Sequence, residues 1–137
     1  MKPIQNLTKD KFKDYGTIID YTEAKNDGWE IVVRSQGPGW RIALLEIERH
    51  ASNQLEYHPL SKESFEPLTG TSLIAVAAFE RPEEFEVFLL DGPVCLHEKV
   101  WHQVICLSEK ATMKITENLD VNCVYYDLKE PFQAKIV

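Results

Sequence analysis

The chain has 137 residues, 44% of them hydrophobic and 27% charged, a composition ordinary for a globular domain. Its 15 basic residues are scattered among 22 acidic ones and leave a formal charge of -7, which argues against a nucleic-acid partner. No apolar run approaches the roughly 20 residues of a membrane span and the first residues lack the apolar core of a signal peptide, so we expect one cytoplasmic domain over residues 1–137, with no membrane partner.

One short helix is predicted near the start of the chain. Thr8 can cap its first turn, and Gly16 suits the left-handed residue that ends a helix. A β-hairpin is predicted next, because β-rich runs at residues 29–33 and 40–48 are joined by the turn-like sequence RSQGPG.

Further strand candidates follow at short intervals, separated by Gly, Pro, Asn, Asp or charged residues. They are residues 53–58, 72–79, 84–90, the run 89–107, 111–116 and 122–128. About eight short strands with one terminal helix indicate an all-β barrel or sandwich, because a parallel sheet needs crossover helices. The charged sequence ERPEEFE at residues 80–86 is interpreted as a solvated hairpin loop.

Three cysteines, Cys95, Cys106 and Cys123, are too far apart for a CxxC metal or redox motif. Their odd number argues against a disulfide framework. We therefore expect buried free thiols.

Polar residues with regular spacing interrupt the apolar strands. Glu56 and His58 share one face of a strand because side chains alternate, and Glu63 and Gly70 follow at intervals of five and seven residues. This spacing resembles the first motif of the cupin fold, in which HxH, a glutamate and a glycine lie on two adjacent strands of a small barrel. Glu56 stands where that motif has its first histidine.

The run LLDGPVCLHEKVWHQVICL at residues 89–107 resembles the second cupin motif, in which a turn leads into a strand with one inward histidine. His102 follows a turn at Glu98 and Lys99, where a glycine is usual at the Lys99 position, and His97 precedes that turn. The resemblance implies that Glu56, His58, Glu63 and His102 converge in the barrel lumen, with His97 close by.

Such a cluster has two chemical uses, which the sequence does not separate. Imidazole and carboxylate groups bind Zn, Mn, Fe or Ni, so Glu56, His58, Glu63 and His102 are candidate ligands of a divalent transition metal. The same groups also make a general acid and base without a metal. A structural, hydrogen-bonded role is the alternative for each histidine, and His50 is expected on the surface.

Several segments resemble the ureidoglycolate lyase family of small cupins. They are LTKDKFKDYGTIID, YHPLSKESFEPL, GPVCLHEKVWH and the Asn122-Cys123 pair, and together they span residues 7–128. The resemblance implies an all-β, cupin-type small barrel (double-stranded β-helix or jelly roll), a homodimer, and cleavage of ureidoglycolate to glyoxylate and urea in purine and allantoin catabolism. The chain departs from the family where arginines are usual, at Tyr57 and at Glu98.

Applied to this chain, the resemblance gives each site residue an expected role. His97 and His102 are expected to act as the acid and base, with Glu63 completing the catalytic set. His58 is expected to hold the substrate or a metal. Lys99 or Lys62 is expected to bind the substrate carboxylate in place of the missing arginine. The alternative is a cupin of different specificity, either a metal-dependent enzyme or a module that binds a small molecule or sugar.

Overall fold

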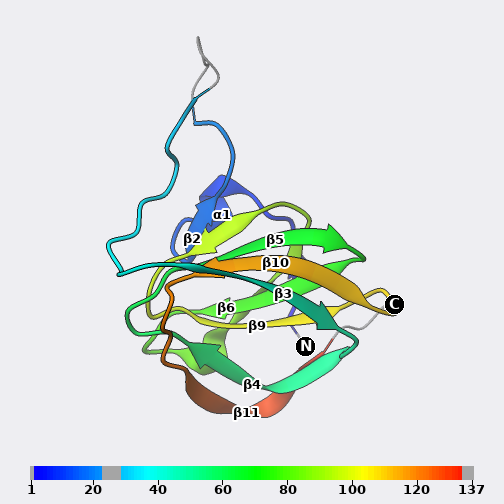
Figure 1. Cartoon of the computed structure of the whole chain (residues 1–137). Coiled ribbons are helices and arrows are strands. Elements are labelled where there is room, and N and C mark those ends of the chain that lie inside the picture. The colour runs from blue at the N-terminus through cyan, green and yellow to red at the C-terminus, as the bar shows by residue number, and fades with distance from the viewer. Residues whose placement is uncertain (1, 23–28, 134–137) are drawn as a thin grey trace.

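The computed structural model describes residues 2–22 and 29–133, and these residues form eleven strands, one α-helix and one 3-10 helix (Figure 1). The elements are β1 (Ile4–Gln5), α1 (Lys9–Phe12), β2 (Gly16–Ile18), β3 (Arg41–Ile47), β4 (Ala51–Tyr57), β5 (Glu63–Thr69), β6 (Ser72–Ala77), η1 (Pro82–Glu84), β7 (Glu86–Leu90), β8 (Val94–Leu96), β9 (Trp101–Cys106), β10 (Ala111–Glu117) and β11 (Val124–Gln133). No helix among the described residues is long and apolar enough to cross a membrane.

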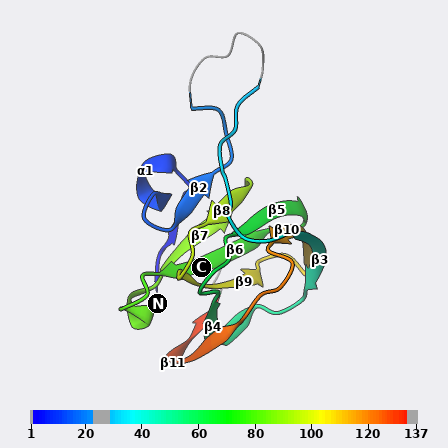
Figure 2. The ribbon, with the colours of Figure 1, turned by 60° about the vertical axis from the view of Figure 1, so that its left-hand side comes forward.

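Two sheets form the walls of a barrel, as the two views in Figures 1 and 2 show. One sheet has the strand order β1-β7-β6-β9-β4-β11 and the other has the order β2-β8-β5-β10-β3. Neighbouring strands are antiparallel except for the short β1–β7 pair. The all-β barrel predicted from the strand spacing is therefore confirmed.

Apolar side chains fill the space between the sheets. Phe65, Phe88, Val104 and Met113 belong to one buried cluster that draws on both sheets. Each fully buried side chain of this size contributes about 1.5–3 kcal/mol to the free energy of unfolding. The inward positions alternate with outward ones along each strand, so the inward apolar side chains form one core between the sheets.

A second apolar cluster covers the other face of the six-stranded sheet. It includes Leu55 and Trp101, against which Leu128 and Phe132 of the long strand β11 pack. The pairing of β11 with β4 shifts register between Asp127 and Phe132. Trp101, whose neighbour His102 points into the barrel, lies in this outer cluster, where its Nε1 donates to the carbonyl of Phe79 over 2.9 Å.

The predicted N-terminal helix is confirmed, but its end differs from the prediction. Thr8 caps α1 by accepting a hydrogen bond from the backbone N–H of Lys11 at 3.3 Å. Gly16 does not end the helix; it begins β2, where a β-carbon would collide with the backbone of Cys95 on β8. Glycine is required there by close strand approach rather than by a left-handed turn.

The hairpin predicted between residues 29–33 and 40–48 is wrong. Residues 29–33 form no strand, and the described parts of the β2–β3 connection first lead away from the barrel and then return to it before β3 (Figures 1 and 2). Gly37 packs so closely on the side chain of Asn118 that a β-carbon would not fit. This contact holds the turn-like sequence beside the end of β10, and β3 pairs with β10 instead.

The remaining strand predictions correspond to β4, β6, β7, β8, β9, β10 and β11, while β5 was not predicted as a separate strand. The three cysteines are free, as expected, but only Cys95 and Cys106 are buried. Cys123 is exposed, because it lies in the connection that leads into β11 rather than within a strand.

Candidate active site

At one end of the barrel, polar side chains take the inward positions that apolar side chains occupy elsewhere. His102 has the parity of the core residue Val104 on β9, and Glu63 has the parity of the core residue Phe65 on β5. Glu56 on β4 is paired with His102 across the sheet. Strand alternation therefore delivers these three polar side chains to the same interior space.

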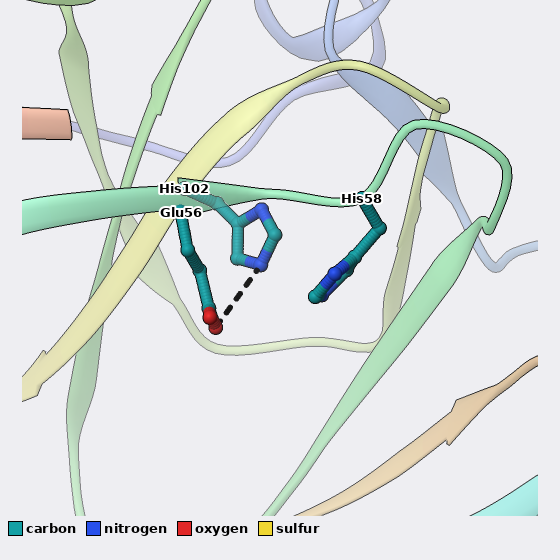
Figure 3. Close-up of side chains that lie close together, drawn as sticks. All are labelled: Glu56, His58 and His102. Atoms are coloured by element: carbon teal, nitrogen blue, oxygen red, sulfur yellow. Dashed lines mark ion pairs between the residues drawn. The ribbon is translucent and has the colours of Figure 1, made fainter. Parts of the chain in front are cut away.

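Glu56, His58 and His102 point toward one another between the strands (Figure 3). Oε1 of Glu56 lies 3.7 Å from Nε2 of His102. One potential metal-ligand atom from each of the three residues lies within 4.8 Å of the others. The convergence of Glu56, His58 and His102 that the cupin motifs predicted is present in the structure.

Glu63 completes this group from the opposite sheet. Its Oε1 lies 2.5 Å from Nε2 of His58 and 3.2 Å from Nε2 of His102. The side chains of these three residues are between 4% and 6% exposed. One carboxylate oxygen is thus shared by two buried imidazoles.

Backbone carbonyls fix both imidazole rings from behind. Nδ1 of His58 lies 3.1 Å from the carbonyl oxygen of Asn122, and Nδ1 of His102 lies 3.0 Å from that of Val100. Because a carbonyl oxygen only accepts, each Nδ1 carries a proton and donates it. The Nε2 atoms therefore face Glu63 either as lone pairs or, in the imidazolium form, as N–H groups.

The charges in this group shift one another's pKa. Burial by itself lowers the pKa of His58, but the Glu63 carboxylate outweighs burial and raises the pKa to about 9. The pKa of His102 is also raised, because Glu63 again outweighs the burial of the ring. Burial favours the neutral form of Glu63, yet the two imidazoles lower its pKa to about 2. Each of these shifts favours the charged form of its group.

Two buried atoms of this group remain without a well-directed hydrogen bond. Among the described residues, neither Oε1 of Glu63 nor Nε2 of His102 has a hydrogen-bond partner of acceptable geometry, although the two atoms lie 3.2 Å apart. Their attraction is electrostatic rather than a directed hydrogen bond. Polar atoms that converge without pairing are suited to a third atom, such as a substrate atom, a water or a metal ion.

The structure places His97 apart from this group. Its Nε2 lies 3.1 Å from the carbonyl oxygen of Lys13, and its backbone N–H donates to Tyr15, so the residue lies against the N-terminal segment. Nothing in the described part of the chain links the His97 ring to Glu63 or His102 by an ion pair or hydrogen bond.

The two predicted carboxylate-binding lysines lie near the turn between β8 and β9. Lys99 is exposed and has a φ of 62°, which explains why glycine is usual at this position of the cupin motif. Its backbone N–H donates to the carbonyl of His58 over 3.2 Å. Nζ of Lys62 lies 3.6 Å from the carboxylate of Glu98, so this lysine already has an anionic neighbour.

Sequence reasoning missed two residues that the structure adds to the group. Glu117, at the inward-facing end of β10, has its Oε1 3.9 Å from Nε2 of His58. Arg41 on β3 binds the other oxygen of Glu117 through Nε at 3.0 Å and Nη2 at 2.8 Å. The signal for Glu117 was present, because it continues the inward alternation of Met113 and Ile115, but the predicted strand stopped one residue short.

A second set of donor atoms in this group could also hold a metal ion. His58, Glu63 and Glu117 each offer an atom within 4.8 Å of the other two. Ligand atoms bound at about 2.1 Å to one ion lie about 3–4 Å apart, so small side-chain movements would bring these atoms into range. Mixed imidazole and carboxylate donors suit the divalent transition metals.

The sequence of the chain is similar to those of known ureidoglycolate lyases. The sequence model of the ureidoglycolate lyase family matches residues 32–135. The chain is 32% identical over 121 residues to a ureidoglycolate lyase of Agrobacterium fabrum, with 72% of each chain covered. It is also 32% identical over 124 residues to ureidoglycolate lyase 2 of Rhizobium meliloti, with 75% of this chain and 76% of the relative covered.

Solved structures support the architecture alone. Two structures of oxalate decarboxylase from Bacillus subtilis, one of them of a variant, match 66% of this chain with a TM-score of 0.50 and 20% identity. The match spans 24% of the oxalate decarboxylase chain. Together with the two facing sheets, this likeness identifies the barrel as a cupin-type jelly roll.

Proposed function

The chain belongs to the ureidoglycolate lyase family, and from this we propose that it cleaves ureidoglycolate to glyoxylate and urea. Within the site, the observation that best supports this proposal is the position of His102. Its buried Nε2 lies within 3.7 Å of Glu56 and 3.2 Å of Glu63, so an imidazole and two carboxylates face one point in the lumen.

The reaction needs two proton transfers and no oxidant. Ureidoglycolate carries a hydroxyl group and a ureido nitrogen on the same carbon. When a base removes the hydroxyl proton, the oxygen's electron pair forms the carbonyl of glyoxylate and the carbon–nitrogen bond breaks. The departing nitrogen then takes a proton and leaves as urea. Each positioned proton transfer is worth about 10²- to 10⁴-fold in rate.

We assign the two transfers to Glu56 and His102. Glu56, whose side chain is 26% exposed, is the carboxylate most open to an entering ligand and is placed to take the hydroxyl proton. His102, held in the imidazolium form beside Glu63, is placed to give a proton to the departing nitrogen. Glu63 then serves to orient His102 and to stabilise its charge, and His58 holds the Glu63 carboxylate in place.

The expected catalytic role of His97 stays a prediction. To act, its ring would have to leave the carbonyl of Lys13 and turn toward the lumen. The geometry favours Glu56 as the second proton-transfer group, because Glu56 already lies beside His102. Lys62 and Lys99 likewise stay candidates for binding the substrate carboxylate.

The proposal is tested by incubating the purified protein with ureidoglycolate and measuring urea and glyoxylate. We expect release well above the spontaneous rate, and its abolition in the His102→Ala variant. The matched control is His50→Ala, because His50 is an exposed histidine outside the lumen group. Release by the wild type no faster than the spontaneous reaction would refute the lyase assignment.

A second candidate function is a metal-dependent cupin enzyme of another specificity. The observation that favours it is the pair of overlapping donor sets, Glu56, His58 and His102 on one side and His58, Glu63 and Glu117 on the other. These residues would hold the ion, which would act as a Lewis acid toward an oxygen of the substrate. Elemental analysis that finds about one equivalent of transition metal, lost in His58→Ala, would support this candidate.

A homodimer and a cytoplasmic location complete the proposal. The family resemblance supports the dimer, and the exposed apolar residues Ile42 and Leu44 on the edge strand β3 offer a surface for it. The free thiols Cys95 and Cys106 fit a reducing compartment. Light scattering of the purified protein measures the oligomeric state, and a monomer at micromolar concentration would refute the dimer.

A further inference from the structure

Arg41 occupies an inward-facing strand position beside the polar group, although its nearest neighbours in that group, Glu117 and Glu63, are distant in sequence. On β3 it has the parity of Ala43 and Leu45, which pack against the core. In the register of the sheet Glu117 is opposite Arg41 on one side and opposite Glu63 on the other. The sheet therefore places Arg41, Glu117 and Glu63 side by side.

Contacts connect Arg41 to the proposed catalytic group. Its guanidinium binds Glu117 through Nε and Nη2, and Glu117 in turn lies 3.9 Å from His58. These two contacts use only two of the five N–H donors of a guanidinium, so the pairing leaves donors for a second carboxylate. The Arg41 side chain is 46% exposed, whereas that of Glu117 is 8% exposed. The arginine is therefore accessible to a ligand from solvent, whereas its partner carboxylate is buried.

The charges of the group explain why an additional cation is needed if the site is to bind an anion. Glu56, Glu63 and Glu117 supply three carboxylates, and the two imidazoles can supply at most two positive charges. Without Arg41 the group repels an anion even when both histidines are protonated, and with Arg41 it can reach neutrality. Arginine also matches the planar geometry of a carboxylate, which a lysine does not.

We propose that Arg41 is the residue that binds the carboxylate of the substrate and so makes the site specific for small carboxylate anions. The inference rests on the proposed function, because it assumes that the same lumen group acts on the bound molecule. In ureidoglycolate the reacting carbon is bonded directly to the carboxylate, so a carboxylate held at Arg41 would bring that carbon to the side of the group where Glu117 and His58 lie. Arg41 thus replaces the arginines that the family has at Tyr57 and Glu98.

The test separates carboxylate binding from catalysis. Glyoxylate is titrated into the wild type and into Arg41→Gln, Arg41→Lys and Arg41→Gln/Glu117→Gln while binding is followed by calorimetry. The double variant removes the carboxylate that Arg41→Gln would leave unpaired. Circular dichroism and the melting temperature confirm that each variant folds. Arg81→Gln is the matched control, because Arg81 is an exposed arginine whose side chain lies 3.6 Å from the carboxylate of Glu84.

We expect Arg41→Gln and the double variant to raise the Kd for glyoxylate by about 10- to 100-fold, with a smaller rise for Arg41→Lys. Arg81→Gln should bind as the wild type does. With ureidoglycolate as substrate, Arg41→Gln should raise KM more than it lowers kcat, since the carboxylate keeps its charge and its bonds through the reaction.

Wild-type protein that does not bind glyoxylate, or Arg41→Gln that binds it as tightly as the wild type, would overturn the assignment of Arg41. Either result is independent of the lyase assay. Conversely, Arg41-dependent binding of glyoxylate in a protein that does not cleave ureidoglycolate would refute the proposed function and leave the carboxylate site standing.

Discussion

His58 and Glu63 form a buried ion pair at the polar end of the barrel, with Nε2 of the imidazole 2.5 Å from Oε1 of the carboxylate. Their side chains are 5% and 6% exposed. The second imidazole, that of His102, meets the same oxygen, and a backbone carbonyl holds each ring from behind. A buried pair with this support is costly to break from one side, because the remaining charge loses its partner.

The first prediction concerns the stability that this pair provides. Glu63→Gln removes the carboxylate nearest to both buried imidazoles and should lower the free energy of unfolding by about 3–5 kcal/mol, measured by urea denaturation. The control is Glu66→Gln on the same strand, which breaks the exposed pair of Glu66 with Lys114 and should cost less than about 1 kcal/mol. Equal losses in the two variants would contradict the burial argument.

The second prediction concerns the pH dependence of stability. The pKa of His58 rises on folding from 6.5 to about 9, so its contribution is complete below pH 6.5 and is lost as the pH rises through 9. The pKa of Glu63 falls from 4.5 to about 2, so its contribution is present above pH 4.5 and is lost as the pH falls toward 2.

The difference in melting temperature between the wild type and the His58→Leu/Glu63→Leu double variant should therefore be most in favour of the wild type between pH 4.5 and 6.5. Above pH 6.5 the melting temperature of the wild type should fall relative to that of the double variant. A difference that does not change up to pH 10 would show that the His58 pKa is not raised.

The third prediction separates the two histidines that were expected to form the catalytic pair. His102→Ala should lower kcat for ureidoglycolate cleavage by at least about 10²-fold, because it removes the proton donor. His97→Ala should keep nearly wild-type kcat, since the ring contacts Lys13 rather than the lumen group. A well-folded His97→Ala protein with the same deficit as His102→Ala would instead establish the pair expected from sequence.

The fourth prediction concerns the turn between β5 and β6. Gly70 has a φ of 74°, and a β-carbon there would collide with the backbone at Lys110 and Ala111. Gly70→Ala should therefore lower the free energy of unfolding by about 1–3 kcal/mol. Gly92→Ala is the control, because a β-carbon at Gly92 meets nothing within 4 Å. Thermal melting of both variants checks the contrast, and similar melting temperatures would argue against strain at Gly70.

The alternation of side chains along strands was readable in the sequence. It predicted that Glu56 and His58 share one face, because a strand turns successive side chains to opposite faces wherever it lies in a fold. The resemblance to the cupin motifs implied that this face points into the lumen. The motif spacing also predicted that these groups meet, and the glycine at Gly70 matched its turn. These features depend on short stretches of chain, so local rules were sufficient for them.

Only the tertiary structure decided which strands became neighbours. Arg41 and Glu117 are 76 residues apart, and no local sequence pattern in either segment predicts that β3 pairs with β10. The local turn sequence predicted a hairpin for β3, but β3 pairs with β10, and Gly37 of the turn sequence lies against Asn118 just beyond the end of β10. The direction of each polar side chain was thus a local property of the sequence, whereas the set of side chains that share the site followed from long-range strand pairing.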